Sequence, residues 1–177
     1  ARGMGSSVRK IQEVGYLLGL MCKYVCEDCD FVIYSSPSGN HSECYLTVQL
    51  EEGTILDNME KVKEKASELG TESQFPFEYV QNLIRSRRVV NNIMVLSHKV
   101  VNPKEQENGQ LANLLKKYRQ EVNPELLFVS VDLTGSGTSV LGETEPNPKD
   151  ILIAGFSDQI LRFVAEKGEG GQLQYVD

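Results

Sequence analysis

The sequence predicts an α/β fold, with one doubly wound, mostly parallel sheet and helices on both of its faces. Short apolar runs typical of buried parallel strands alternate with segments whose apolar residues recur at helical spacing. The clearest run is Asn91–His98, in which four apolar residues, Ile93–Leu96, stand between polar ends. With 177 residues, the chain is long enough for one domain with a sizeable core.

The first half of the chain contains five expected elements. Apolar residues at helical spacing predict a helix over Val8–Val25, and Phe31–Tyr34 is typical of a short strand. Apolar and polar residues alternate in Cys44–Leu50, which predicts a half-exposed antiparallel strand at the edge of the sheet. Two amphipathic helices are expected next, over Ile55–Ala66 and Phe75–Arg85.

The second half continues the alternation of strands and helices. The Asn91–His98 strand is followed by a helix, a strand, a long loop, a last strand and a last helix. We expect these over Gln110–Glu121, Leu126–Leu133, Thr134–Lys149 and Ile151–Phe156, with the last helix capped by Ser157 and carrying Ile160–Val164.

The domain organisation follows from this order. Residues 1–168 are expected to form a single domain, and residues 169–177 a polar tail. A doubly wound domain normally opens with a strand, whereas this sequence opens with a helix. We therefore expect the chain to be a fragment of a larger protein, without a first strand that would be central in the sheet.

Charge limits the classes of partner. The net charge of -7 disfavours a broad phosphate-binding surface, which requires clustered Lys and Arg. The one dense basic cluster is Arg85, Arg87 and Arg88. It is expected to stabilise a helix end, and a nucleic-acid contact is the alternative. The sequence contains no signal peptide and no apolar run that approaches a membrane span of about 18 residues.

The four cysteines predict ordinary thiols. Cys22, Cys26, Cys29 and Cys44 include one C-x-x-C pair, whereas a zinc site needs two pairs or added histidines at ligand spacing. We expect reduced, buried or half-buried thiols, with zinc as the alternative. The absence of a disulfide framework indicates the cytoplasm or nucleus.

The sequence predicts no enzyme. Gly135–Gly137 lacks the ending of a phosphate-binding P-loop, and no nucleophile elbow is present. His98 at a strand end could act as a base or a ligand, but satisfied hydrogen bonding is the commoner use of such a histidine. A hydrolase or nucleotide-binding enzyme is therefore the third-ranked hypothesis.

Function is expected at the carboxyl ends of the parallel strands, where ligands bind on such sheets. Polar residues stand at the ends of two expected strands and after one expected helix. They are Ser35, Ser36, Thr71, Ser73, Ser97 and His98.

The combined pattern resembles a von Willebrand factor A-type domain, in the version that follows the RNA-binding ring of the TROVE and Ro autoantigen family. Within that family, it is most similar to the version in the component shared by vault and telomerase ribonucleoproteins. The resemblance covers nearly the whole chain and depends on the order of its parts. These are Met4 with the Val8–Val25 helix, Asp30–Ser36, Leu69–Ser73, Asn92–His98, Tyr118–Leu133 and Ile153–Phe163.

The resemblance implies a divalent cation at the strand ends, held in the family by a D-x-S-x-S motif, a Thr and an Asp. Thr71 matches the Thr, but His98 stands in the place of the Asp, and Ala1 and Gly3 stand where the two serines would be. Magnesium prefers hard oxygen ligands, so we expect no cofactor, with Mg²⁺ at a degenerate site as the alternative.

The function that the resemblance implies is a non-catalytic interaction or scaffold domain of a ribonucleoprotein component. It would bind protein partners, while a neighbouring ring holds a small non-coding RNA, in the cytoplasm or the nucleus and away from membranes. A metal-dependent ligand-binding domain is the second hypothesis.

Overall fold

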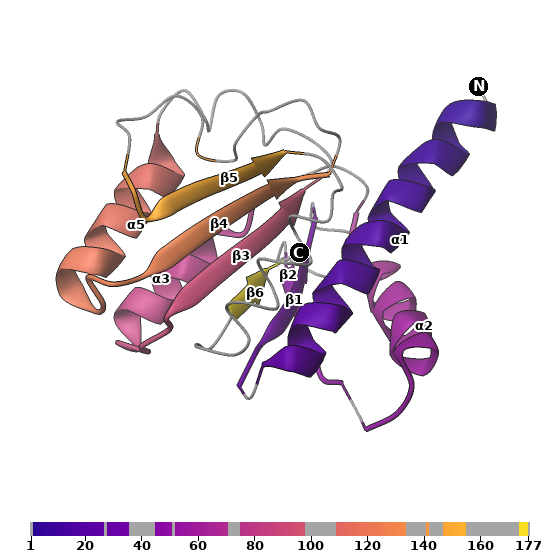
Figure 1. The fold of residues 1–177 in the computed structure, drawn as a ribbon, viewed down its shortest axis with the longest axis horizontal. Coiled ribbons are helices and arrows are strands. Elements are labelled where there is room, and N and C mark those ends of the chain that lie inside the picture. Colours follow the sequence, from indigo (N-terminus) through magenta and orange to yellow (C-terminus); the bar gives the residue numbers. More distant parts are fainter. Residues whose placement is uncertain are drawn as a thin grey trace.

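The computed structural model describes residues 2–26, 28–35, 45–50, 52–70, 75–97, 109–133, 141, 147–154 and 174–176. In this part of the chain, strands and helices alternate around one sheet (Figure 1). The mixed α/β class expected from the sequence is therefore confirmed.

The sheet has six strands in the order β2-β1-β6-β3-β4-β5. All neighbours are parallel except β1 and β2, which are antiparallel, so the predicted antiparallel edge strand is confirmed. The strands are β1 Phe31–Tyr34, β2 Tyr45–Val48, β3 Asn92–Ser97, β4 Leu127–Asp132, β5 Asp150–Ala154 and β6 Gln174–Val176.

Helices cover both faces of the sheet (Figure 1). On one face, α3 and α5 pack on Val32, Ile93 and Val95. On the other face, α1 and α2 pack on residues of opposite parity, such as Phe31 and Met94. This alternation follows from the pleat of a strand, which directs successive side chains to opposite faces. The described helices are α1 Arg2–Val25, α2 Ile55–Ala66, α3 Phe77–Arg85 and α5 Gln110–Glu121.

β6, which is third in the sheet order, differs from the prediction for the end of the chain. Residues 169–177 are predicted to be a polar tail, but Gln174–Val176 form β6 between β1 and β3. Tyr175 is in register with Phe31 on one side and with Met94 on the other. The physical reason is that β1 and β3 each present an edge of unpaired backbone groups, which any extended segment can satisfy.

Two helix starts differ from the prediction. The first helix, α1, begins at Arg2 rather than Val8. The third, α3, begins at Phe77, with Pro76 as its N-cap residue, because the proline ring disfavours the helical conformation at the preceding Phe75. The expected last helix from Ser157 and most of the expected loop over Thr134–Lys149 lie outside the described residues.

Candidate binding groove

The carboxyl edge of the sheet is where the sequence predicts function. The Ser35 hydroxyl lies just beyond β1 and donates to the Gly70 carbonyl at 2.6 Å. Ser97 ends β3, is buried, and its carbonyl accepts from the Leu133 amide at 2.8 Å. Ser36, Thr71, Ser73 and His98 lie outside the described residues. The structure therefore describes two of the six predicted residues at this edge: the Ser35 hydroxyl is bonded within the fold, and Ser97 is buried.

The sequence analysis does not identify Asp132, a buried carboxylate at this edge. Asp132 ends β4 in register with Ser97. Its signal in the sequence is an acidic residue that closes an apolar run. Within the described part of the chain, no three His, Cys, Asp or Glu residues form a group that could hold a metal ion. Mg²⁺ prefers several hard oxygen ligands, and Asp132 could supply one of them at the described part of this edge.

A hollow of the described structure lies elsewhere, between α3 and the edge strand β2. This binding groove has a volume of about 780 Å³. Tyr45 and Thr47 of β2, with Gln49 directly after the strand, line one wall, since every second side chain of an extended segment shares a face. Residues of α3 and of the turn after it line the other wall. The lining is Asp30, Tyr45, Thr47, Gln49, Tyr79, Asn82, Leu83, Arg85, Ser86 and Arg88.

Tyr79 is the central side chain of the groove. Only 8% of it is exposed, and among the described residues its hydroxyl finds no hydrogen-bond partner. Its ring packs edge-on against Tyr45, with centroids 5.7 Å apart. Burial raises the pKa of the Tyr79 hydroxyl, and the nearby Asp30 carboxylate, which makes no full hydrogen bond to it, raises it further. The group therefore stays protonated and can donate a hydrogen bond.

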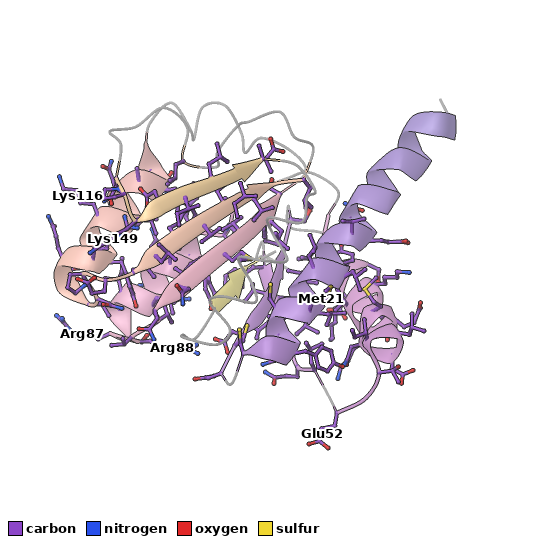
Figure 2. The ribbon with its side chains drawn as sticks, in the orientation of Figure 1. Met21, Glu52, Arg87, Arg88, Lys116 and Lys149 are labelled. Atoms are coloured by element: carbon purple, nitrogen blue, oxygen red, sulfur yellow. The ribbon has the colours of Figure 1, made fainter. Side chains whose placement is uncertain are left out.

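Charged residues close one end of the groove. Arg88 donates to the Asp30 carboxylate, and this hydrogen bond raises the pKa of Arg88. Arg85 ends α3, is exposed, and makes no ion pair with any residue that the structure describes. Arg87 and Arg88 lie at the end of the sheet where β3 begins (Figure 2). This end is opposite to the strand tips that the sequence analysis favours.

Tyr118 of α5 holds the turn that carries Arg88 through two hydrogen bonds of its hydroxyl. The fully buried Tyr118 hydroxyl accepts from the Val90 amide at 2.8 Å and donates to the Arg88 carbonyl, also at 2.8 Å. Within the turn, Arg87 adopts a left-handed conformation with φ 52°. Its guanidinium donates to the Glu121 carbonyl at 3.3 Å and does not line the groove.

The sequence analysis thus groups three arginines that the fold separates. Arg85 and Arg88 belong to the groove, whereas Arg87 binds the end of α5. The sequence analysis does not identify Tyr45, Tyr79 or Asn82 as groove residues. The Asn82 side chain donates to the Tyr45 hydroxyl at 3.1 Å. A signal exists in the helical spacing of Tyr79, Asn82 and Ser86.

The described cysteines lie in α1 and directly after its end. Cys22 and Cys29 are buried and free of disulfides, and Cys26 is half-buried. Burial raises the pKa of the Cys22 thiol to about 12, and a hydrogen bond with Cys26 followed by burial raises that of Cys29. These residues fit the expectation of reduced, buried or half-buried thiols, while Cys44 lies outside the described residues.

We expect Cys22 and Cys29 to react slowly with a thiol reagent in the folded protein. The thiolate is the nucleophile, and at pH 8 both groups remain protonated because their pKa values are raised. Alkylation with iodoacetamide, followed by mass spectrometry, should modify these sites at least tenfold more slowly in native buffer than in urea. Equal rates in the two conditions would contradict the raised pKa values.

Comparison with known proteins gives one family. The model of the family described as a domain of unknown function, DUF5920, matches residues 10–177. The chain belongs to the DUF5920 family. No curated protein and no solved structure matches it. The matched region of this DUF5920 chain includes the whole groove, and none of its described helices is long and apolar enough to cross a membrane.

Proposed function

We propose that the chain is a non-catalytic protein-interaction domain of a ribonucleoprotein component, with the groove between α3 and β2 as its docking surface. The observation that carries the proposal is the Tyr79 hydroxyl, which is buried in the groove without a partner among the described residues. Buried polar groups in folded proteins are nearly always hydrogen-bonded. A donor left unpaired in a hollow therefore favours a ligand that completes it.

The position of β2 favours a protein as that ligand. In the described sheet, β2 pairs with β1 alone, so its outer edge carries backbone donors and acceptors for a further strand. An extended segment of a partner can add to such an edge and place its side chains beside the groove. The groove side of the added strand would then meet Tyr45, Thr47 and Gln49.

The ribonucleoprotein context of the proposal comes from the resemblance to the von Willebrand factor A-type domains of the TROVE family. The chain carries a net charge of -7, which suits a domain that binds proteins while a neighbouring ring holds the RNA. The proposed interaction needs no metal and no catalytic group, and it would take place in the cytoplasm or the nucleus.

Photo-crosslinking in living cells tests the proposal. A p-benzoylphenylalanine is placed at position 47, on the groove side of β2, and in a separate variant at position 60, on the exposed surface of α2. We expect a protein conjugate at position 47 that survives ribonuclease, and none at position 60. No conjugate at position 47, or conjugates there that contain only RNA, would contradict the proposed function.

A further inference from the structure

We infer that the groove recognises a carboxylate side chain, an Asp or a Glu, on the extended segment of the partner. This inference rests on the proposed function and adds the chemistry of the ligand. It follows from three features of the groove: its local charge, its unpaired donor and the spacing of its strand wall.

The local charge is opposite to that of the whole chain. Two arginines, Arg85 and Arg88, line the groove against one carboxylate, Asp30, so the ionisable lining sums to one positive charge. The chain as a whole carries -7. Because Asp30 is already paired with Arg88, Arg85 offers a guanidinium that no described residue neutralises. A guanidinium is well suited to bind a carboxylate through two parallel hydrogen bonds.

The unpaired donor has the same preference. A protonated Tyr79 hydroxyl donates a hydrogen bond, and a carboxylate is the strongest acceptor that a protein partner offers. Asn82, one helical turn further along α3, holds the Tyr45 ring at the groove by its bond to the hydroxyl. An amide side chain in the place of the carboxylate would bring one acceptor and no charge, so a Gln should bind less well than a Glu.

The strand wall fixes where the acidic residue lies. Successive side chains of a strand added to β2 would point to opposite faces, so every second residue would face α3. The groove residues Tyr45 and Gln49 are separated by four positions, which leaves room for two or three partner side chains on this face. One acidic residue among them can reach Arg85 and Tyr79.

A peptide array tests the inference. Seven-residue peptides of Val, Thr and Lys are identical except at the central position, which carries Glu, Asp, Gln, Lys or phosphoserine. The folded chain is labelled and its retention on each peptide is measured. We expect at least tenfold greater retention on the Glu or Asp peptide than on the Gln peptide, as a charge-assisted hydrogen bond predicts.

Matched variants locate this preference in the groove. Tyr79→Phe removes only the hydroxyl and keeps the ring contact with Tyr45, so the variant should fold. We expect Tyr79→Phe and Arg85→Ala each to reduce the preference for Glu about tenfold. Arg87→Ala and Tyr24→Phe serve as controls and should leave it unchanged, because neither residue lines the groove.

Several outcomes would overturn the inference. They are equal retention on Gln and Glu, a preference for Glu that Tyr79→Phe does not reduce, tenfold stronger retention on phosphoserine than on Glu, and no retention on any peptide. If Gln and Glu bind equally while position 47 still crosslinks to protein, the proposed function stands and only the acidic preference fails. If the Glu preference holds but position 47 yields no protein conjugate, the proposed function fails instead.

Discussion

Deletion of residues 174–177 should destabilise the fold by about 4 kcal/mol or more, or abolish cooperative unfolding. The deleted segment contains β6, which alone joins β1 to β3 in the sheet order. Two register pairs connect it to β1 and three to β3. Without β6, both neighbours would have an unpaired edge inside the sheet, where helices on both faces restrict access of water.

The remaining contacts predict the form of the loss. Residues of β1 and β3 share both hydrophobic clusters: Val32 with Ile93 on one face, and Phe31 with Met94 on the other. Hydrophobic contact across the gap should therefore keep the truncated chain compact, while the exposed strand edges favour aggregation.

Urea denaturation followed by circular dichroism provides the measurement, with sedimentation to detect association. Deletion of Asp177 alone is the matched control, since this residue follows β6, and it should leave the midpoint unchanged. A truncated chain that unfolds at the midpoint of the intact chain would show that β6 does not stabilise the sheet.

β6 also illustrates what the sequence can predict. The strand β3 is predictable because Ile93–Leu96 are continuously apolar, and all six residues of the strand are buried on a two-sided sheet. β6 has three residues, begins with Gln174, and forms only because two other strands present free edges on either side. No local pattern carries that information.

The groove was not predictable for a related reason. Its residues come from β2, from α3 and from the segments beside them, and a described ion pair joins Asp30 and Arg88, which are 58 positions apart. The sequence identifies the arginines as a cluster because they are neighbours in the chain. It does not show that a turn with a left-handed Arg87 directs Arg88 towards the groove and leaves Arg87 on α5. Of the predicted strand-tip serines, the structure describes Ser35 and Ser97: the Ser35 hydroxyl is bonded within the fold, and Ser97 is buried.

The Tyr118→Phe variant should lose about 2–3 kcal/mol of stability, since removing one partner of a buried hydrogen bond leaves the other unsatisfied. Phe keeps the ring in the core of α3 and α5, so the loss comes from the hydroxyl alone. The Val90 amide, in a residue that is 2% exposed, would have no acceptor. The Val90 carbonyl is less affected, because the Asn123 amide donates to it at 2.9 Å.

The same substitution should weaken the groove. The Tyr118 hydroxyl donates to the Arg88 carbonyl, so its loss frees the turn that positions Arg88 against Asp30. We therefore expect retention on the Glu peptide to fall in Tyr118→Phe, although Tyr118 does not line the groove. The fall should be smaller than in Tyr79→Phe, which removes a donor to the ligand itself.

Tyr24→Phe is the matched control for stability. The Tyr24 hydroxyl also has two partners, the Gly53 carbonyl at 2.8 Å and the Asn58 amide at 2.9 Å, but the residue is 50% exposed. Water can replace these bonds, so Tyr24→Phe should cost less than about 1 kcal/mol. The urea midpoints of the two variants, measured side by side, distinguish the cost of losing a buried hydroxyl from the cost of losing an exposed one. Equal losses would show that Tyr118 does not hold the turn.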